Sequence, residues 1–220
     1  MALNLSRQSG LIPTDKISEL DLTVVGAGAI GSHTAECLGK IGIRELEIWD
    51  FDSVESHNLP NQGYRLSDLG KMKATALKQR LEEDIGLSVL ARTERLEAGV
   101  QFTNPIVISA VDSMASRKVI WDNVQQSLGV YLFIDARMAA LYGEIYAVDL
   151  SDSASQEGYE KTLFSDSEVL PEPCTEKATI FCAQGMAAWI TSIVADYVAD
   201  GEINEKKLSI DFVRKAVGSV

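Results

Sequence analysis

Short apolar segments alternate along the chain with longer segments in which apolar residues recur every three or four positions. The run at 22–25 is almost continuously apolar, as expected of a strand buried on both faces, and residues 29–41 follow with helical spacing up to Gly42. This alternation continues along the sequence. It predicts strands at 22–25, 44–52, 87–93, 104–112, 130–137, 143–150 and 207–213, and helices at 29–41, 71–84, 114–128 and 182–200.

Strands that alternate with helices are typical of an α/β fold. We therefore predict a Rossmann-like, doubly wound and mostly parallel sheet flanked by helices. The late part of the sheet is expected to be antiparallel, although the pattern leaves the direction of the strand at 143–150 open. The strand at 207–213 is expected at an edge.

The 220 residues are enough for one domain with a substantial core, and we interpret 1–220 as a single domain. Residues 1–20 are expected to form an arm or a short helix ahead of the core. Residues 151–175 are polar and acidic and contain Pro171 and Pro173, which predicts a long loop of the crossover type.

Composition excludes several classes of protein. The formal net charge of −12 argues against a nucleic-acid-binding surface, which needs a basic footprint. No stretch approaches the roughly 18 consecutive apolar residues of a membrane span. Cys37, Cys174 and Cys182 are an odd number without a C-x-x-C pair, so we expect no disulfide framework, no four-cysteine zinc site, and a reducing, cytoplasmic setting.

The segment "LTVVGAGAIGSH" joins the first predicted strand to the first predicted helix through Gly26, Gly28 and Gly31. These glycines permit a tight turn, close approach of a phosphate to the backbone, and close packing of helix on strand. The helix N-terminus then offers unpaired N–H groups. Asp50, at the end of the second strand, lies where a ribose hydroxyl needs an acceptor. This arrangement suits NAD, FAD, SAM or ATP equally.

Three later features favour ATP. Asp112 ends a buried strand, where its carboxylate would repel a pyrophosphate unless Mg²⁺ lay between them. Lys71 and Lys73 begin a helix, where cations are unfavourable unless an anion such as phosphate holds them; solvated lysines are the alternative. Asp50 and Asp52 flank Phe51 at one strand end, so that one carboxylate can bind the ribose and the other can position the following loop.

These motifs occur in the order "VVGAGAIGSH", "WDFDSVESHNLPNQ", "DLGKMKA" and "ISAVDSMASR". The ordered set resembles the adenylation domain of the ThiF, MoeB and ubiquitin-activating enzyme superfamily, from about Leu5 to Arg117 and more loosely beyond. The resemblance implies that a carboxyl terminus is activated as an acyl-adenylate. It further implies the following roles: Asp50 as ribose ligand, Asn58 and Gln62 as nucleotide contacts, Lys73 as triphosphate ligand, and Asp112 as Mg²⁺ ligand.

The N-terminal "LSRQSGL" resembles an S-R-Q element of that superfamily. There, the arginine reaches across a dimer into the partner's site. The resemblance therefore implies a homodimer in which Arg7 acts in the partner's site, whereas without it Arg7 would be a charge on a flexible arm.

The sequence departs from the superfamily pattern in two places. The usual N-L-x-R-Q reads N-L-P-N-Q here, and Asn61 cannot supply the bidentate cation of an arginine. Arg137 is a hypothetical substitute, in which case Arg137→Ala would abolish pyrophosphate exchange; an ion pair with Asp135 is the alternative. The paired C-x-x-C motifs that bind zinc in many bacterial members are also missing.

Cys174 lies in "PEPCTEK", which resembles the P-x-C-T stretch that carries the thioester-forming cysteine of ubiquitin-type activating enzymes. A thiolate there could accept the acyl group from an adenylate. The alternative is an ordinary loop cysteine. Cys182 and Cys37 are expected to be packed, and Trp189, Ile190 and Val194 are expected in the core or in a dimer interface.

The hypothesis is an Mg²⁺-dependent and ATP-dependent adenylyltransferase that acts on a ubiquitin-like or sulfur-carrier protein, or on a peptide C-terminus. Asn61 keeps a second interpretation open, a nucleotide-binding partner without chemistry in a heteromeric enzyme. A third is an NAD-dependent oxidoreductase, against which Lys73 and Asp112 argue.

Overall fold

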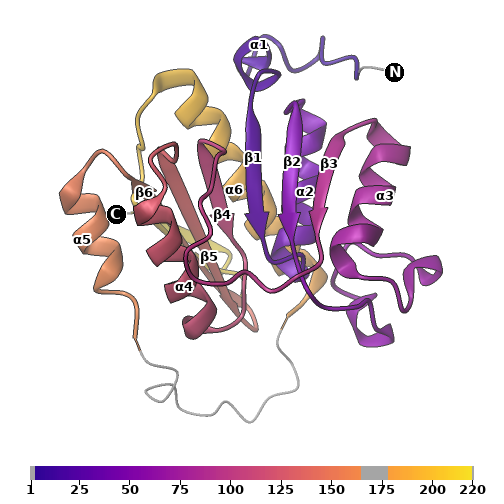
Figure 1. Cartoon of the computed structure of the whole chain (residues 1–220). Coiled ribbons are helices and arrows are strands. Elements are labelled where there is room, and N and C mark those ends of the chain that lie inside the picture. The colour runs from indigo at the N-terminus through magenta and orange to yellow at the C-terminus, as the bar shows by residue number, and fades with distance from the viewer. Residues whose placement is uncertain (1–2, 165–177, 220) are drawn as a thin grey trace.

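A computed structural model describes residues 3–164 and 178–219 (Figure 1). The described strands are β1 (Asp21–Val25), β2 (Glu45–Trp49), β3 (Ser88–Arg92), β4 (Ile106–Ser109), β5 (Leu132–Ala139), β6 (Tyr142–Asp149), β7 (Lys207–Asp211) and β8 (Ala216–Ser219). The α-helices are α1 (Thr14–Ile17), α2 (Ala29–Ile41), α3 (Lys73–Ile85), α4 (Met114–Gln126), α5 (Ser153–Glu160) and α6 (Ile180–Asp200), and two 3₁₀ turns lie at Ser56–Asn58 and Leu66–Asp68.

The described strands form one sheet in the order β3-β2-β1-β4-β5-β6-β7-β8. Neighbouring strands from β3 to β5 are parallel, and the pairs from β5 to β8 are antiparallel. The predicted α/β fold, mostly parallel with a late antiparallel part, is therefore confirmed. The chain order reverses between β1 and β4, and in such sheets ligands bind outside the carboxyl ends of the strands at this switch point.

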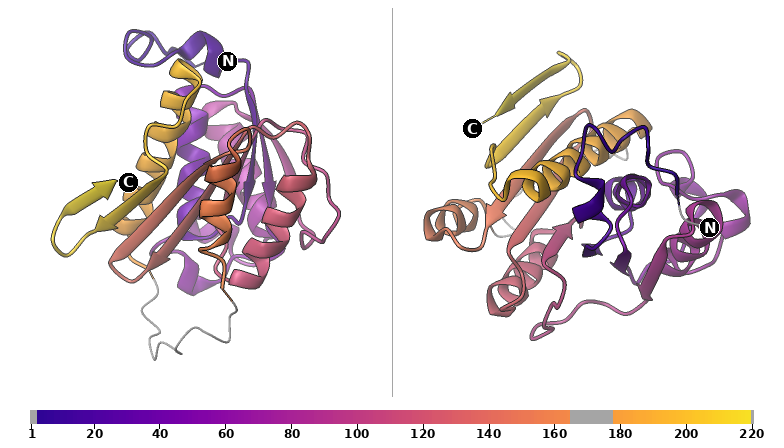
Figure 2. Two further views of the ribbon diagram at one scale, coloured as in Figure 1. Left: turned by 90° about the vertical axis from the view of Figure 1, so that its left-hand side faces the viewer. Right: turned by 90° about the horizontal axis from the view of Figure 1, so that it is seen from above.

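Helices cover both faces of the sheet (Figure 2). On one face, α2, α3 and α6 pack on a core that includes Leu22, Leu38, Leu77 and Ile190. On the other face, α4 and α5 enclose an aromatic cluster in which the ring of Tyr159 lies 4.8 Å from Trp121 and 5.3 Å from Phe133, between centroids. Because both faces are covered at the centre of the sheet, β1 and β4 are buried along almost their whole length. In β2, buried apolar residues alternate with half-buried ones, two of which are glutamates.

The expected loop at 151–175 is wrong for its first part, because α5 lies within it. The Asp152 side chain accepts a hydrogen bond from the N–H of Ala154 at 2.9 Å and so caps the helix. The helix buries only Ser155 and Tyr159, so the sequence lacks an apolar period there, and the tertiary contact of Tyr159 supplies the stabilisation. The rest of that predicted loop, from residue 165, lies outside the described residues.

Other predicted boundaries shift where strands are shorter than their apolar runs. The runs at 44–52 and 104–112 end as strands at Trp49 and Ser109, which leaves the acidic residues beyond each strand in turns. The strand at 207–213 is not an edge, because β8 pairs with it. Among the described helices, none is long and apolar enough to cross a lipid bilayer.

The aromatic cluster makes a direct test of the fold possible. Phe133→Ala is expected to lower the free energy of unfolding by about 3–5 kcal/mol, because a fully buried ring is replaced by a cavity. The matched control is Tyr131→Ala, where the side chain is 59% exposed and the change is expected to stay within about 0.5 kcal/mol. Urea unfolding measures both, and equal losses in the two variants would contradict this core.

Candidate functional site

The glycine loop between β1 and α2 contains glycines that packing requires and one that it does not. A Cβ on Gly26 would lie 2.7 Å from the carbonyl oxygen of Ala110, and Gly26 has a φ of +94°. A Cβ on Gly31 would lie 1.8 Å from the carbonyl oxygen of Gly26. Both positions therefore require glycine for packing. A Cβ on Gly28 would meet no atom within 4 Å, so the protein leaves open space at the N-terminus of α2.

This open space adjoins backbone donors. Gly28 is the N-cap of α2 and provides no side-chain cap, so the N–H groups of the first helical turn have no capping acceptor from it. Donors of this kind, at the positive end of the helix dipole, are suited to a phosphate. The loop geometry fits a nucleotide phosphate group. Close approach of a phosphate would explain why position 28 is a glycine, which packing does not require.

Asp50 lies against the glycine loop. Its carboxylate accepts hydrogen bonds from the N–H of Ala27 at 2.7 Å and from the N–H of Asp52 at 2.9 Å. Burial raises the pKa of this carboxyl group, while the positive charge of Lys73 and the two backbone bonds oppose the shift. The acid at the end of β2 is thus placed beside the loop that follows β1, as its proposed role requires.

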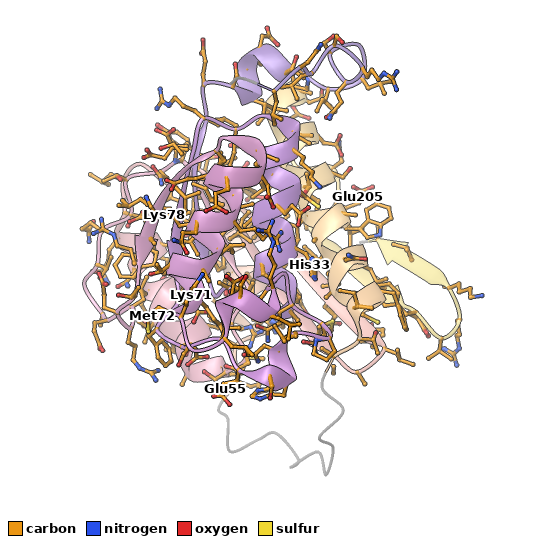
Figure 3. All side chains as sticks on the ribbon, turned by 90° about the vertical axis from the view of Figure 1, so that its right-hand side faces the viewer. His33, Glu55, Lys71, Met72, Lys78 and Glu205 are labelled. Atoms are coloured by element: carbon orange, nitrogen blue, oxygen red, sulfur yellow. The ribbon has the colours of Figure 1, made fainter. Side chains whose placement is uncertain are left out.

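Lys73 is the first residue of α3 and is buried, with 7% of its surface exposed. Its Nζ lies 2.9 Å from Oδ2 of Asp52, and its N–H donates to the carbonyl oxygen of Asp52 at 2.8 Å. Lys71 instead donates to Asp68 and Gln79. The two predicted lysines therefore differ. Lys73 is held by Asp52 near Asp50, whereas Lys71, labelled in Figure 3, connects Asp68 to Gln79 of α3.

Asp112 follows β4 and is exposed. Within the described part of the chain its carboxylate forms no ion pair or hydrogen bond. No group of three or more candidate metal-ligating side chains exists among the described residues. A Mg²⁺ ion held by Asp112 would therefore take its remaining ligands from phosphate oxygens and water, which is the usual way in which Mg²⁺ binds with nucleotides.

The segment 52–72 is fastened to α2 and α3. The N–H of Gly63 donates to Oγ of Ser32 at 2.9 Å, and Arg80 binds both Glu36 and the carbonyl oxygen of Gly63. Oδ1 of Asn58 accepts from the N–H of Glu55 at 2.8 Å, so this atom stabilises the turn at Ser56–Asn58.

The same segment carries the side-chain amides of Asn61 and Gln62. Nδ2 of Asn61 donates to the carbonyl oxygen of Ala178 at 3.4 Å. Oδ1 of Asn61 and Oε1 of Gln62 are buried and have no hydrogen-bond partner among the residues that the structure describes. Because an asparagine carries no positive charge, Asn61 does not supply the cation that an arginine would supply at this position.

Arg137 takes part in a buried ion cluster. Its Nε lies 2.7 Å from Oδ2 of Asp135, its two terminal nitrogens donate to Thr162, and its guanidinium group lies 4.4 Å from the ring centre of Tyr146. The alternative considered for Arg137, an ion pair with Asp135, is what the structure shows. A role of Arg137 toward phosphate stays a prediction.

The remaining predicted residues lie apart from this site. Arg7 is exposed on the N-terminal arm, which lies at the opposite end of the sheet from the carboxyl ends of β1 and β2 (Figure 1). Cys174 lies outside the described residues. Cys182 is buried as predicted, and Cys37 is half-buried in α2. Ile190 and Val194 are fully buried, whereas Trp189 is 39% exposed.

Sequence analysis missed Tyr64. Its hydroxyl donates to the carbonyl oxygen of Ala27 at 2.6 Å, so that Ala27 is bound through its N–H by Asp50 and through its carbonyl by Tyr64. Tyr64 is buried, and this burial raises the pKa of its hydroxyl well above the usual value, which keeps it a donor. A lone aromatic residue in a polar loop is the only signal that the sequence offers.

Comparisons with known proteins identify relatives of this chain. The model of the ThiF family matches residues 2–212. The chain is 26% identical over 176 residues to the probable adenylyltransferase/sulfurtransferase MoeZ of Mycobacterium tuberculosis, covering 77% of this chain and 43% of that protein. It is 34% identical over 104 residues to the NEDD8-activating enzyme E1 catalytic subunit of Arabidopsis thaliana, covering 45% of this chain and 23% of that protein. The chain thus spans less than half the length of these relatives.

The fold also resembles a solved structure. The crystal structure of E. coli MccB with ATP matches with a TM-score of 0.72 at 17% sequence identity, over 94% of this chain and 65% of that chain. At this identity the likeness concerns the fold, which confirms the α/β architecture of the described residues.

The two kinds of glycine predict losses of stability that differ in size. Gly31→Ala is expected to lower the free energy of unfolding by about 2 kcal/mol or more, because the new Cβ would collide with the backbone of Gly26. Gly28→Ala is expected to cost less than about 1 kcal/mol, because its Cβ enters open space. Chemical denaturation followed by circular dichroism measures both, and a larger loss for Gly28→Ala would refute the distinction.

Proposed function

The chain belongs to the ThiF family, and from this premise we propose that it is an ATP-dependent adenylyltransferase. Its substrate is the C-terminal carboxylate of a ubiquitin-like or sulfur-carrier protein, or of a peptide. The observation that carries the proposal is the space left open at Gly28 beside Asp50 and Lys73. A redox dinucleotide would also use the glycine loop, but it gives no reason for a buried lysine and an unpaired carboxylate at the same edge.

In the proposed reaction, a carboxylate oxygen of the substrate attacks the α-phosphorus of ATP in line with the leaving group. The bond from the α-phosphorus to the bridging oxygen breaks, and pyrophosphate leaves with its electron pair. Asp50 binds the ribose, Asn58 and Gln62 contact the nucleotide, and Lys73 offsets negative charge on the phosphates. Asp112 would hold Mg²⁺, which supplies charge neutralisation of the triphosphate when bound.

Support for the substrate class comes from the relatives. One curated relative is named a probable adenylyltransferase/sulfurtransferase and another a NEDD8-activating enzyme, and MccB has been crystallised with ATP and with MccA. We propose that this chain shares the adenylating reaction with them. The identity of its carrier or peptide belongs to the proposal.

We further propose that the protein acts as a homodimer in which Arg7 enters the partner's site. The N-terminal arm that carries Arg7 lies at the opposite end of the sheet from the carboxyl end of β1 (Figure 1). The outer face of α6 carries Phe181, 53% exposed, and Trp189, and large exposed apolar side chains on one helix face are typical of a surface that another chain covers.

The acyl group has a candidate acceptor within the same chain. Cys174 would attack the acyl carbon of the adenylate as a thiolate, so that a thioester forms and AMP leaves. Adenylation does not depend on this step.

A second function rests on one observation: Asn61, whose Oδ1 is buried, stands where the superfamily pattern has an arginine. A chain without that cation would bind nucleotide as the inactive partner of a heteromeric enzyme. ATP binding without any ATP–pyrophosphate exchange, tested with candidate carriers, would favour this second function. Binding of NADH in a fluorescence titration, with no binding of ATP, would replace both with an oxidoreductase.

The contrast between the two lysines tests the proposed chemistry. Lys73→Met is expected to lower kcat/KM for ATP–pyrophosphate exchange by about 10²–10³-fold, because a positioned charge next to the phosphates is lost. Lys71→Met is the matched control, since its amino group is already bound to Asp68 and Gln79, and its rate is expected to stay within about 3-fold of the wild type. Equal losses in the two variants would contradict the role of Lys73.

Cys174 is tested separately from adenylation. Cys174→Ala is expected to retain pyrophosphate exchange and to lose a thiol-sensitive adduct with the carrier, because only the second step uses the thiolate. Non-reducing electrophoresis with and without thiol detects the adduct, and Cys37→Ala serves as the control. An adduct that persists in Cys174→Ala would rule out this acceptor.

A further inference from the structure

Arg117 lies in the first turns of α4, five residues after Asp112, and has no role in the reaction proposed above. It is almost completely buried, with 5% of its surface exposed. Its terminal nitrogen donates to the carbonyl oxygen of Val111 and, at 3.3 Å, to that of Ala136. Its Nε lies 3.1 Å from Oδ1 of Asp135. One guanidinium group thus joins the end of β4 to β5.

These bonds close a short turn around Asp112. Ser113 caps α4, since its Oγ accepts from the N–H of Ser116 at 3.2 Å, and its carbonyl accepts from the N–H of Arg117 at 3.1 Å. Val111 on the other side of Asp112 is held by the Arg117 side chain. The backbone is therefore fixed on both sides of a carboxylate that is itself exposed.

The same strand end touches the glycine loop. The position of a Cβ on Gly26 lies 2.7 Å from the carbonyl oxygen of Ala110 and 3.2 Å from Cγ1 of Val111. Displacement of residues 110–111 would therefore move Asp112 relative to the open space at Gly28. The distance between the carboxylate of Asp112 and the glycine loop therefore depends on the position of the residues that follow β4.

Asp135 is bound by a second cation, Arg137. Removal of Arg117 would leave this fully buried carboxylate paired, which avoids the large cost of an uncompensated buried charge. Arg117 is therefore not needed to balance the charge of Asp135. Among the hydrogen bonds of the described residues, however, only Arg117 connects Asp135 to Val111.

We infer that Arg117 is a positioning residue that holds Asp112 where its carboxylate could bind Mg²⁺ when a nucleotide occupies the glycine loop. This inference rests on the proposed function. It adds a buried arginine, acting through the backbone of Val111, to the residues that determine how strongly Mg²⁺ contributes to ATP binding.

The test measures ATP affinity by isothermal titration calorimetry, once with Mg²⁺ and once with EDTA. In the wild type, Mg²⁺ is expected to tighten ATP binding. In Arg117→Met, that gain is expected to fall by about 10-fold or more, the usual effect of losing a residue that orients a metal ligand, while affinity in EDTA stays within about 3-fold. Arg117→Lys, which keeps the charge near Asp135 but cannot bridge both strands, serves if the methionine variant does not fold.

A double-mutant cycle separates positioning from a general structural role. Asp112→Asn is expected to lose the Mg²⁺-dependent gain, and adding Arg117→Met or Arg117→Lys to it is expected to cause no further loss in that gain. Arg44→Met, at an exposed ion pair with Asp21 near the start of β1, is the control and is expected to behave as the wild type.

The outcomes distinguish the inference from its premise. A wild type that binds no ATP would overturn the proposed function. A wild type that gains affinity from Mg²⁺, with the full gain retained in the Arg117 variants or lost additively with Asp112→Asn, would overturn the role of Arg117 and leave the proposed function standing.

Discussion

The contact between the backbone of Gly26 and the Cα of Gly31 is the constraint on which the site depends. Only hydrogen atoms on Gly31 let the first turn of α2 approach the carbonyl of Gly26, since a Cβ would lie 1.8 Å from that oxygen. This approach keeps the N-terminus of α2 close to the end of β1. The unpaired donors of α2 are thereby aimed at the switch point between β1 and β4, where an anion can reach them.

Parallel pairing then gathers the remaining groups. Because β1, β2 and β4 run in the same direction, the residues that follow each strand meet at one edge, and these are the glycine loop, Asp50 and Asp112. Lys73 comes from a helix rather than from a strand end, and its ion pair with Asp52 brings it to the same edge. Two hydrogen bonds hold the glycine loop at Ala27, one from its N–H to Asp50 and one from Tyr64 to its carbonyl. These bonds preorganise the loop for a ligand.

The antiparallel part of the sheet serves other purposes. It supports α6, which is apolar on almost every side and buries one face against α2 and the sheet while exposing Phe181 and Trp189. It also supports α5 and the ion cluster of Arg117, Asp135 and Arg137, which connects β4, β5 and the residues just after α5. The parallel half thus brings the glycine loop, Asp50 and Asp112 to one edge of the sheet. The antiparallel half holds Arg117, which binds the carbonyl of Val111, through Asp135, and it supports an apolar helix.

Local sequence patterns determined most of the fold and indicated which candidate residues lie together at one edge of the sheet. The alternation of apolar runs and helical periods predicted the parallel sheet, and the spacing of Gly26, Gly28, Gly31, Asp50, Lys73 and Asp112 selected the residues at its edge, because strand ends and helix starts are local features. The tertiary structure decided what depends on distant neighbours. It showed that Gly28 alone of the three loop glycines faces open space and that Lys73 rather than Lys71 is buried beside Asp52. It also showed that Tyr159 of α5 packs against Trp121, that Tyr64 binds the carbonyl of Ala27, and that Arg117 binds the carbonyl of Val111. No local pattern encodes these contacts, since each joins residues whose proximity arises only when the strands pair and the helices pack.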